Sequence, residues 1–531
     1  MRRWNGWGDS ADQYELTDDA RRFLNDRVGP SAAPRDATLE EALATVPGSR
    51  LPDSTPYFST DPSVRLLHAR GQSFPDWVAL RSGRVGPFAD AVAQPGSHDE
   101  AAAALAEARK LGAVVIPYGG GTSVVGHLQV PADDRPVVNI SLERMNRLIG
   151  MDDKSMLATF GGGTPGPQIE AQLRPYGLML GHFPQSYEYS TIGGWVVTRS
   201  SGQQSLRYGR IEQLFAGGRI STPRGELRVG GVPASAAGPD LREVVLGSEG
   251  RAGLLTEVSA RVRRLPECED FHGIFFPNWE AAIEAVRALA QADLPLSMLR
   301  LSNEVETETQ LRLAGHPHLI RWLQRYLGVR GVQSGQCMLM MGVTGSLAQV
   351  RRMRRDALAL AKRYKGVHVG KAMGKSWAKS RFRGPLLRNS LWEAGYAADT
   401  VETAVDWPKV TGLMRAIEKA ASDALLAENE RVHAFTHLSH MYRQGCSIYS
   451  TFVFRSAGDV DADLERWRKL KARVSETIVE HGGTISHQHG VGVDHAPYLA
   501  AEKGALGLDV LRSALRELDP NGMMNPGKLL A

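Results

Sequence analysis

Hydrophobic and polar residues follow two different periods along this chain, and together they predict a fold that combines helices with strands. Apolar residues three and four positions apart mark amphipathic helices at residues 98–111, 279–290 and 347–364. Short runs enriched in β-branched and aromatic residues mark strands at residues 113–117 and 447–454. Because helical and strand segments succeed one another, the pattern indicates an α+β or α/β fold.

The same two periods predict the remaining elements and divide the chain into four parts. Further strands are expected at residues 136–140, 156–160, 194–198, 272–276 and 337–343, and further helices at 38–44, 167–176, 407–428, 461–481 and 505–518. The four parts are an N-terminal wrap (1–90), a first domain (91–265), a second domain (266–500) and a C-terminal helix and tail (501–531) that returns to the first domain. The sequence Leu265-Pro266-Glu267 breaks the pattern between the two domains. Strand–helix units recur in the second domain, which predicts a smaller sheet with helices on one face.

Composition narrows the class of protein. The 531 residues are 42% hydrophobic and 23% charged, which is typical of a globular protein and excludes collagen-like, disordered and coiled-coil chains. No run of about 18 uncharged apolar residues occurs, so no membrane span is predicted. Acidic residues occur near the start of the chain and no apolar stretch follows them, so we expect no secretory signal. Three widely spaced cysteines without a CxxC pair fit a reducing compartment and exclude a disulfide scaffold, so we expect a cytoplasmic protein.

Positive charge is concentrated in one segment. Between Arg351 and Arg388 there are thirteen Lys or Arg residues and one acid, Asp356, although the net charge of the whole chain is only +5. One interpretation is a solvated helix face followed by a flexible basic loop. The others are a funnel for an anionic substrate or a peripheral contact with anionic lipid on the inner face of a membrane. Aromatic residues for base stacking are sparse there, so we expect no nucleic-acid partner.

A glycine-rich segment, PYGGGTSVVG at residues 117–126, follows a predicted strand. Consecutive glycines let the backbone approach a ligand closely, and successive N–H groups in such a turn form an anion-binding concavity. A plain tight turn is the alternative. The spacing matches neither the Walker pattern nor G-x-G-x-x-G, which disfavours a P-loop or a nicotinamide site. The candidate ligand-binding residues here are Pro117, Tyr118, Gly119, Gly120, Gly121, Thr122 and Ser123.

Three more segments share this composition of small residues, hydroxyls and glycines: QSYEYSTIGGW (185–195), TRSSGQQ (198–204) and GSEGRAGLL (247–255). They add the candidates Gln185, Ser186, Ser190, Thr191, Gly194, Thr198, Arg199, Ser200, Ser201, Glu249, Gly250, Gly253 and Leu255. The four segments in this order resemble the FAD-binding domain of the vanillyl-alcohol-oxidase, or PCMH-type, flavoprotein family. The resemblance implies an α+β fold with a two-part PCMH-type FAD-binding domain and a second α/β cap domain, which has an antiparallel sheet and helices on one face.

The same resemblance implies how FAD is held. In that family the glycine loop holds the pyrophosphate and the later loops lie along the isoalloxazine and adenine rings. Several members attach the flavin covalently through a histidine in the glycine loop. This loop has Tyr118 and Gly119 there and no histidine before His127, so we expect non-covalent FAD.

A closer resemblance involves GHFPQSYEYSTIGGWVVTRSSGQQSLRYGRIEQL together with ISHQHGVG and DPNGMMNPGKLL. These segments are similar to the alkyldihydroxyacetonephosphate synthase family, and the likeness runs from about Arg3 to Leu530. It implies exchange of the acyl group of acyl-dihydroxyacetone phosphate for a fatty alcohol through a flavin N5 adduct, in ether lipid synthesis. The implied partners are a phosphorylated lipid and a fatty alcohol. The oligomeric state stays open, with a homodimer as one alternative.

Four histidines fall within fifteen residues, in HGGTISHQHGVGVDH: His481, His487, His489 and His495. A metal site, structural histidines and acid–base histidines are the three interpretations. We expect no metal, because no pattern of Cys, Asp or Glu completes a ligand set. An imidazole exchanges protons near neutral pH, so His487 and His489 are catalytic candidates. In the resembled family the middle position is also a histidine, whereas this chain has Gln488.

The remaining candidates depend on the resemblance. Tyr449 matches the proton-exchanging tyrosine of the synthases, and a phenol needs a neighbouring cation to act as a base, a role open to the histidine pair. Arg388 matches an arginine that binds the substrate phosphate, and a guanidinium can hold phosphate through two hydrogen bonds. Arg300 is expected to end a strand facing the same site. His182 is expected to approach the flavin, with a loop or capping histidine as the alternative.

Two other functions stay open. The first is an FAD-dependent oxidoreductase that dehydrogenates a hydroxy acid or a lipid alcohol. Gln488 favours it, and the absence of H-x-G-D-G-N, expected in FAD-linked D-lactate and glycolate dehydrogenases, opposes the hydroxy-acid class. The second is a peripheral lipid-binding protein that keeps flavin as a structural element.

Overall fold

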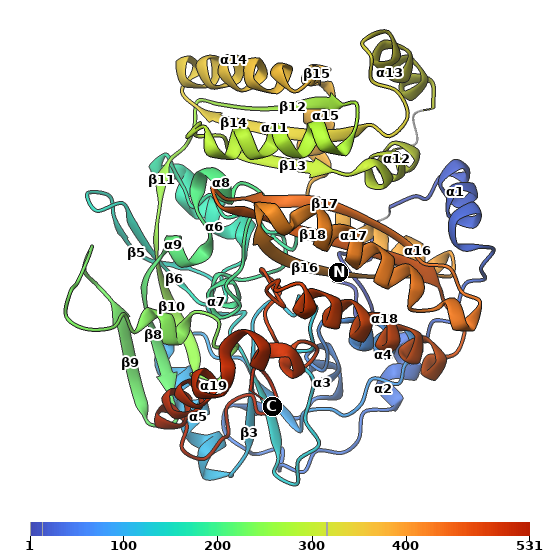
Figure 1. Ribbon diagram of the computed structural model, residues 1–531. Coiled ribbons are helices and arrows are strands. Elements are labelled where there is room, and N and C mark those ends of the chain that lie inside the picture. The colour runs from blue at the N-terminus through green and yellow to red at the C-terminus, as the bar shows by residue number, and fades with distance from the viewer. Residues whose placement is uncertain (1, 13, 315–316, 531) are drawn as a thin grey trace.

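The computed structural model describes residues 2–12, 14–314 and 317–530. Figure 1 shows the sheets of the first domain, in blue and green, below the yellow and orange sheet of the second domain. The N-terminal wrap carries α1 (Asp18–Val28), α2 (Leu39–Ala44), α3 (Pro62–Leu67) and α4 (Phe74–Ser82). Its side chains Trp7, Phe74 and Trp77 belong to the core of the second domain. The N-terminal segment therefore packs on both domains, since its short strand β1 (Phe58–Ser59) joins a sheet of the first domain.

The first domain begins with a four-stranded sheet in the order β1-β2-β4-β3: β1 (Phe58–Ser59), β2 (Ala91–Ala93), β4 (Val137–Ser141) and β3 (Val114–Tyr118). Helix α5 (His98–Lys110) connects β2 to β3, and both strands run parallel to β4. The Ser97 side chain caps α5 by accepting a hydrogen bond from the Glu100 N–H. Apolar residues at helical spacing, among them Ala101 and Leu105, bury its inner face. The helix and strand predicted here are confirmed.

An antiparallel sheet of five strands completes the first domain in the order β5-β6-β10-β8-β9: β5 (Leu148–Asp152), β6 (Leu157–Gly161), β10 (Leu254–Arg261), β8 (Phe215–Thr222) and β9 (Gly225–Gly230). Around it lie α6 (Gly166–Leu173), η1 (Arg174–Tyr176), α7 (Ile192–Val197), α8 (Ser205–Tyr208), α9 (Ile211–Leu214), α10 (Arg242–Val245) and the pair β7 (Leu178–Met179) and β11 (Arg263–Arg264). Strands β5, β8, β9 and β10 are not among the predicted elements.

One predicted strand is wrong. Residues 194–198 lie within and just after helix α7, because Thr191 caps it through the Gly194 N–H and because Ile192, Trp195 and Val196 bury one helical face. The valines there suggest a strand by composition, but burial at a spacing of three and four residues decides the conformation.

The second domain is built on a seven-stranded antiparallel sheet in the order β15-β12-β14-β13-β17-β18-β16: β15 (Val367–His368), β12 (Cys268–Phe276), β14 (Cys337–Gly345), β13 (Met298–Ser302), β17 (His433–Met441), β18 (Gly445–Arg455) and β16 (Tyr396–Asp406). Helices on one face form its main core: α11 (Trp279–Gln291), α14 (Leu347–Arg363), α17 (Trp407–Asp423) and α18 (Val460–Glu480). This is the antiparallel sheet with helices on one face that the resemblance implies. Further helices, α12 (Glu304–Leu313) and α13 (Pro317–Val329), pack near β12 and β14.

Alternation along the central strands separates the two faces of this sheet. Val401, Ile448 and Leu438 point into the core beneath the helices. The neighbouring positions, such as Thr400 on β16 and Tyr449 on β18, point to the other face. That face is turned toward the first domain, so its polar side chains end between the two domains.

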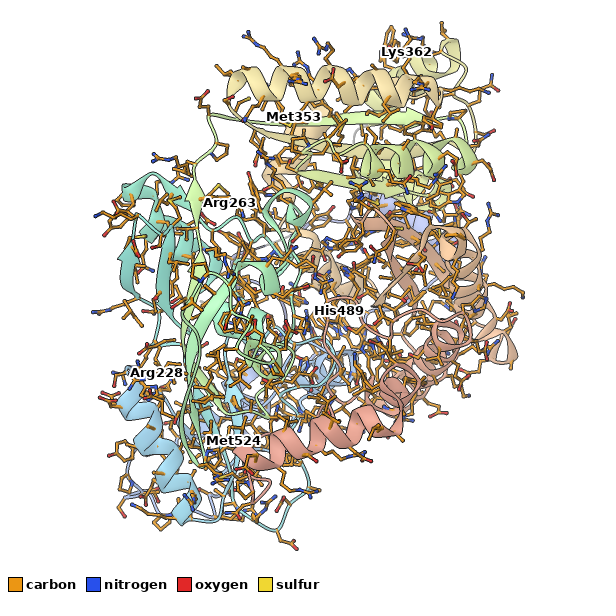
Figure 2. The ribbon with its side chains drawn as sticks, turned by 60° about the vertical axis from the view of Figure 1, so that its left-hand side comes forward. Arg228, Arg263, Met353, Lys362, His489 and Met524 are labelled. Atoms are coloured by element: carbon orange, nitrogen blue, oxygen red, sulfur yellow. The ribbon has the colours of Figure 1, made fainter. Side chains whose placement is uncertain are left out.

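The basic segment contains helices in place of the expected loop. After α14 and β15 come α15 (Ala372–Ser380), η2 (Gly384–Leu386) and α16 (Leu387–Glu393). Most arginines of α14 are exposed, whereas Arg381 and Arg388 turn inward and are only partly exposed. The segment therefore has an outer half and an inner half. Figure 2 labels Lys362 in the outer half, at the end of the molecule farthest from Met524.

The C-terminal segment returns to the first domain. The short helix η3 (Leu426–Glu428) lies earlier, between α17 and β17. Helix α19 (Leu499–Leu518) follows η4 (Ala496–Tyr498) directly and has a break at Gly504. The tail then pairs with β3 through the bonds Val115 N–H to Met523 O and Asn525 N–H to Val115 O, both 2.8 Å. In the part of the chain that the structure describes, no helix has the length and apolar character needed to cross a bilayer.

Candidate active site

A cavity of about 410 Å³ lies between the loops of the first domain and the polar face of the second-domain sheet. Most predicted site residues line it: Pro117, Tyr118, Gly119, Gly120, Gly121, Thr122, Ser123, Gln185, Ser186, Ser190, Thr191, Gly194, Thr198, Ser200, Glu249, Gly250, Gly253, Leu255, Arg300, Arg388, Tyr449 and His489. Its volume falls within the range of small-molecule and cofactor sites. The four loop segments and the catalytic candidates therefore share one space.

The glycine loop presents its backbone to this cavity. Among the hydrogen bonds between described residues, none is donated by the N–H groups of Gly120, Gly121, Thr122 or Ser123. A Cβ atom added at Gly120 would lie 1.9 Å from the Tyr189 carbonyl oxygen, so only glycine allows this loop to pack on its neighbour. Four successive free N–H groups form a concavity that suits the pyrophosphate of a dinucleotide. The loop therefore fits FAD.

A small polar cluster fixes the far end of the glycine loop. The Ser123 hydroxyl lies 2.7 Å from His127 Nδ1, and His127 Nε2 lies 3.1 Å from the Glu249 carboxylate. The same carboxylate accepts hydrogen bonds from the N–H groups of Val491 and Gly492. Glu249 thus joins two cofactor loops to the C-terminal segment. His127 lines the cavity and is not among the predicted residues.

On the opposite wall, strand register brings three side chains into one row. Glu402 on β16 and His437 on β17 both pair with Tyr449 on β18. The Tyr449 ring stacks on His437 at 4.8 Å and meets His489 edge-on at 5.8 Å. Burial raises the pKa of Tyr449, and the neighbouring Glu402 carboxylate raises it further. The phenol is therefore protonated at pH 7.

The cation that faces Tyr449 is an arginine. Arg300 Nη2 donates to Glu306 at 2.7 Å and lies 3.0 Å from His437 Nδ1, and its charge lowers the Tyr449 pKa. The expectation that the histidine pair supplies this charge is wrong. Burial lowers the pKa of His489 to about 4 and lowers that of His487 as well, so both rings are neutral at pH 7.

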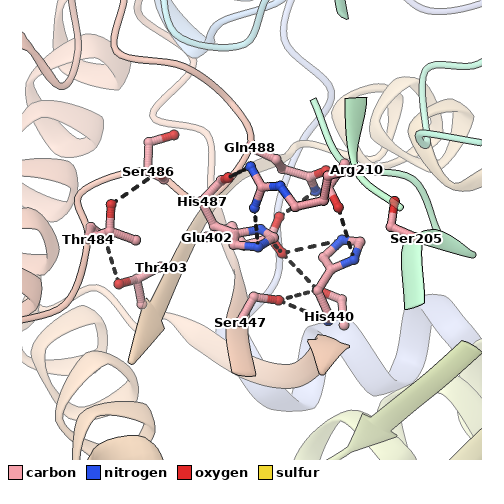
Figure 3. A network of polar contacts seen from close by, with 12 residues as sticks. Ser205, Arg210, Glu402, Thr403, His440, Ser447, Thr484, Ser486, His487 and Gln488 are labelled. Carbon is pink, nitrogen blue, oxygen red and sulfur yellow. Dashed lines mark hydrogen bonds and ion pairs between the residues drawn. The ribbon is translucent and has the colours of Figure 1, made fainter. Parts of the chain in front are cut away.

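His487 belongs to a separate network behind the cavity wall, shown in Figure 3. Its Nε2 lies 2.7 Å from the Tyr442 hydroxyl and 2.8 Å from Arg210 Nη1, and its Nδ1 lies 3.2 Å from Glu402 Oε1. His440 stacks on the same imidazole at 4.9 Å. His489 lines the cavity and His487 does not. Residues 485–491 do not form a strand, so side chains two positions apart need not point to the same side. His487 and His489 therefore do not act on one space.

No metal site is expected from the sequence, yet Glu402, His440 and His487 place one ligand atom each within 4.8 Å of one another. A guanidinium only donates, so the 2.8 Å contact from Arg210 makes His487 Nε2 an acceptor and places the ring proton on Nδ1. A protonated Nδ1 has no free lone pair, so this atom of His487 cannot bind a metal. Glu402 already accepts hydrogen bonds from the Ser439 hydroxyl and the Gln488 amide. The contacts favour a proton network, and the absence of a metal stays a prediction.

Arg388 offers unused donors inside the cavity. Its Nη1 donates to the Gln72 carbonyl oxygen at 2.6 Å, and its guanidinium lies 4.6 Å from the Trp77 ring. Among the described residues, no partner exists for its buried Nε and Nη2 atoms. Burial lowers its pKa to about 10, which still leaves it charged at pH 7. A buried cation with two free donors calls for an anion, and phosphate satisfies both.

Besides His487, three more predicted residues lie outside the cavity. His182 is buried beside Trp195 with its Nε2 3.1 Å from the Ser200 hydroxyl, and burial lowers its pKa to about 3. It is a buried loop histidine that contacts a cavity-lining serine, and its approach to the flavin stays a prediction. Arg199 pairs with Glu243 at the surface, and the Ser201 hydroxyl lies 3.2 Å from His440 Nδ1.

Sequence reasoning missed several side chains that complete the site. His437, Glu306, Asp399 and His127 line the cavity, while Arg210 and Glu402 build the network behind it. Of these residues, Asp399 and Glu402 lie on β16 and His437 lies on β17, and neither strand was predicted. Alternating polar residues in HAFTHLSHM are a signal that could have revealed β17.

Comparison with known proteins covers both domains. A model of the FAD linked oxidases, C-terminal domain, matches residues 265–529, and one of an FAD binding domain matches residues 89–231. The alkyldihydroxyacetonephosphate synthase of Trypanosoma brucei brucei is 30% identical over 572 aligned residues, which cover 99% of this chain and 92% of that protein. That of Dictyostelium discoideum is 30% identical over 489 residues, covering 90% and 79%. A solved alkyldihydroxyacetonephosphate synthase structure superposes with a TM-score of 0.85 at 26% identity, covering 99% and 98% of the two chains.

Proposed function

This chain belongs to the alkyldihydroxyacetonephosphate synthase family of FAD-binding proteins, and on that premise we propose that it replaces the acyl group of acyl-dihydroxyacetone phosphate by a fatty alcohol. The bond from C1 to the acyl oxygen breaks and a fatty acid leaves. C1 then bonds to the alcohol oxygen, and the alcohol proton is released. The exchange balances without net oxidation.

One observation supports this proposal: a buried arginine with two free donors lies in the same cavity as a protonated phenol and the loops that fit FAD. Arg388 and Tyr449 come from α16 and β18, and both line the cavity that the glycine loop closes from the other side. The carboxylate of a hydroxy acid could also bind Arg388. The choice of a phosphorylated substrate therefore rests on the family relationship.

Each side chain has a role that follows from its position. Arg388 holds the phosphate through Nε and Nη2. Tyr449 exchanges the C1 proton with the substrate, and the neutral His489 imidazole, with its pKa of about 4, is the proton acceptor beside it. Arg300 balances the negative charge that develops when the proton leaves, while His437 and Glu306 hold its guanidinium in place.

When bound, FAD supplies an electrophilic ring system that can accept and return electron density at the reacting carbon. The glycine loop, Thr191, Gly194 and Thr198 are the residues of this chain that would hold it. The free N–H groups of the loop offer the pyrophosphate its donors.

The direct test is incubation of the purified yellow protein with acyl-dihydroxyacetone phosphate and a fatty alcohol, followed by mass spectrometry. We expect an alkyl ether of dihydroxyacetone phosphate and an equal amount of free fatty acid. Anaerobic bleaching of the flavin by a hydroxy acid or a lipid alcohol, with no ether formed, would contradict the proposal and favour an oxidoreductase.

We also propose that FAD is held without a covalent bond. His127, which follows the glycine loop, is engaged by Ser123 and Glu249. Heat denaturation followed by centrifugation is expected to leave the yellow colour in the supernatant. Colour that stays with the precipitated protein would contradict this.

Finally, we propose that the protein works in the cytoplasm, at the inner face of a membrane, because both of its long-chain substrates partition into bilayers. Cell fractionation with and without high salt tests this, and a protein found outside the cytoplasm would overturn it.

Light scattering on the purified protein distinguishes a monomer from a homodimer, which is the assembly we propose.

A further inference from the structure

The N-terminal loop, here defined as residues 2–9, closes on itself and contacts both walls of the cavity. The Arg3 N–H donates to the Gly8 carbonyl oxygen at 2.9 Å. The Arg3 guanidinium donates to the carbonyl oxygens of Asp9 and Asp12 at 3.1 and 2.9 Å. Because these bonds join the two ends of the loop, a shift at one of its contacts is passed on to the others.

One contact of the loop lies on the cofactor wall. Arg2 Nη2 donates to the Gly120 carbonyl oxygen at 2.5 Å, and Arg2 Nη1 lies 3.4 Å from the Glu143 carboxylate. The Arg2 guanidinium also lies 5.9 Å from the ring centroid of Tyr189, the residue against whose carbonyl group Gly120 packs. Arg2 therefore holds the glycine loop through a backbone carbonyl, which leaves the N–H groups of that loop for the cofactor.

A second contact of the loop lies on the opposite wall, at Asn389. The Trp7 N–H donates to Asn389 Oδ1 at 3.2 Å, and Asn389 Nδ2 donates to the Trp7 carbonyl oxygen at 2.9 Å. Arg81 Nη2 donates to the same Oδ1 at 3.1 Å. Asn389 is buried, so these three hydrogen bonds fix its side chain with little competition from water.

Two glycines allow this close contact. A Cβ atom added at Gly6 would lie 2.6 Å from Asn389 Oδ1. Gly8 has a φ of 83°, in the left-handed region that favours glycine, and a Cβ atom added there would lie 2.5 Å from Leu386 Cδ2. The glycines on either side of Trp7 therefore let the loop lie directly against the start of α16.

Asn389 is the neighbour of the arginine that we assign to the phosphate. Both residues lie on α16, a helix of seven residues without a side-chain cap at its N-terminus. The guanidinium groups of Arg388 and Arg81 lie 4.6 and 4.7 Å from the Trp77 ring. A helix this short is held mainly by its tertiary contacts. The hydrogen bonds of Asn389 therefore help to fix the position of Arg388.

We propose that Asn389 is a positioning residue, through which the N-terminal loop holds Arg388 at a fixed place relative to the glycine loop. Arg2 anchors the loop on the wall that fits FAD, and Asn389 anchors it on the wall that fits the substrate phosphate. A misplacement of about 1 Å can lower a reaction rate about a hundredfold, so a link between the two walls matters for the reaction. The inference rests on the proposed function in that it takes Arg388 as the phosphate ligand.

The first test is the binding of dihydroxyacetone phosphate to the holoenzyme, measured by isothermal titration calorimetry. In Gly6→Ala the added methyl group pushes on Asn389 but removes no hydrogen-bonding group. We expect about tenfold weaker binding and an unchanged FAD content. Gly48→Ala, where an added Cβ meets nothing within 4 Å, is the matched control and should bind as the wild type does. Wild-type binding by Gly6→Ala would overturn the inference.

A double-mutant cycle shows whether the loop acts through Arg388. We expect Asn389→Ala to weaken binding about tenfold, and Asn389→Asp to weaken it less, because a carboxylate still accepts from Arg81 and from the Trp7 N–H. In an Arg388→Lys background, Asn389→Ala should change the Kd by less than about twofold, since coupled residues are not additive. A merely structural role would give the same loss in both backgrounds, and that result would overturn the inference.

The contact with the cofactor wall is tested with Arg2→Ala. We expect FAD to dissociate about three- to tenfold faster, because the glycine loop loses a charged hydrogen-bond donor. The gain in fluorescence of released FAD after dilution measures this rate. Arg22→Ala, exposed on α1, is the control and should release FAD at the wild-type rate. An Arg2→Ala protein that keeps FAD as long as the wild type would show that the loop does not join the two walls.

Ether formation separates this inference from the proposed function. A wild type that binds dihydroxyacetone phosphate but forms no ether contradicts the proposed function and leaves the positioning role intact. Where ether is formed, Gly6→Ala should raise KM for acyl-dihydroxyacetone phosphate about tenfold and leave KM for the fatty alcohol unchanged. An equal rise in both KM values would mean a general loss of structure and would overturn the positioning role.

Discussion

The two walls of the cavity are built by different means. The cofactor wall consists of loops whose backbone N–H groups and glycines do the binding, and its residues come in short runs such as 117–123. The opposite wall consists of side chains from separate strands, with Arg300, His437 and Tyr449 brought together only by sheet register. A ligand with a fixed shape and fixed charges can be held by a fixed backbone. A reaction that moves protons needs side chains whose charge and position can be tuned.

The electrostatics of the walls differ accordingly. The glycine loop offers neutral dipoles, whereas the sheet wall holds buried ionised groups in pairs, such as Glu306 with Arg300 and Asp399 with Lys471. Burial alone would raise the pKa of the Glu306 carboxyl, but Arg300 and His437 hold it at about 2. The pairing keeps these buried groups ionised, because each charge has a partner of opposite sign close by.

The largest expected effect comes from filling the backbone wall. In Gly120→Ala the new Cβ would lie 1.9 Å from the Tyr189 carbonyl oxygen, so the loop must move away from residues 189–191. We expect the purified variant to contain only a trace of FAD by absorbance at the flavin band. Gly150→Ala, where an added Cβ meets nothing within 4 Å, is expected to keep its full FAD content. A fully yellow Gly120→Ala protein would show that the loop does not form the cradle.

On the sheet wall, Tyr449→Phe removes a hydroxyl but no backbone contact. We expect the rate of ether formation to fall by about 10²- to 10⁴-fold, which is the usual contribution of a positioned acid–base group. FAD content should be unchanged, because Tyr449 belongs to the other wall. Tyr176→Phe, at a site 57% exposed, is the control and should match the wild type. A normal rate for Tyr449→Phe would assign proton exchange to another group.

This division also explains how much the sequence could predict. The glycine loop and its three companion segments were found from composition, because backbone binding demands glycine and hydroxyl residues at the site itself. Tyr449 and Arg388 were found only through a family resemblance. Glu402 and His437 were missed because their positions depend on strand pairing, which for β13 and β17 joins Leu301 to Leu438. Glu306 was missed because it lies on α12, directly after β13. Helix α7 was mistaken for a strand, since its valines favour a strand by composition and only its Thr191 cap and buried face decide for a helix.

A smaller effect is expected where the sheet domain meets the substrate phosphate. Arg388→Lys keeps the charge but loses the two free donors, Nε and Nη2, that a phosphate can bridge. We expect KM for acyl-dihydroxyacetone phosphate to rise about 10- to 100-fold, since hydrogen bonds to charged groups contribute about 1.5–3 kcal/mol. FAD content should stay normal. The exposed Arg352→Lys is the control, and an equal rise in KM for a dephosphorylated substrate would remove Arg388 from the phosphate site.

The smallest expected effect concerns Asp494, on the C-terminal segment where the two walls meet. Its Oδ2 is buried and, among the described residues, lacks a partner, and its N–H contacts the Val125 carbonyl. Burial raises the pKa of Asp494 to about 7, and Lys471 offsets this only in part. The unfolded chain ionises near pH 4, so between pH 4 and pH 7 the folded protein binds one more proton than the unfolded one. Its stability therefore falls as the pH rises through this window.

Asp494→Asn removes this ionisation, so its advantage over the wild type should be absent near pH 4 and complete at pH 8. We expect the free energy of unfolding to gain about 1 to 3 kcal/mol at pH 8, a fraction of what the full pKa shift allows. The readout is the difference in melting temperature between variant and wild-type holoenzyme, expected to reach a few degrees at pH 8. The exposed Asp153→Asn should show no such trend. A constant difference across this range would mean that Asp494 is ionised in the folded protein at all these pH values, and that Lys471 compensates its charge where the two walls meet.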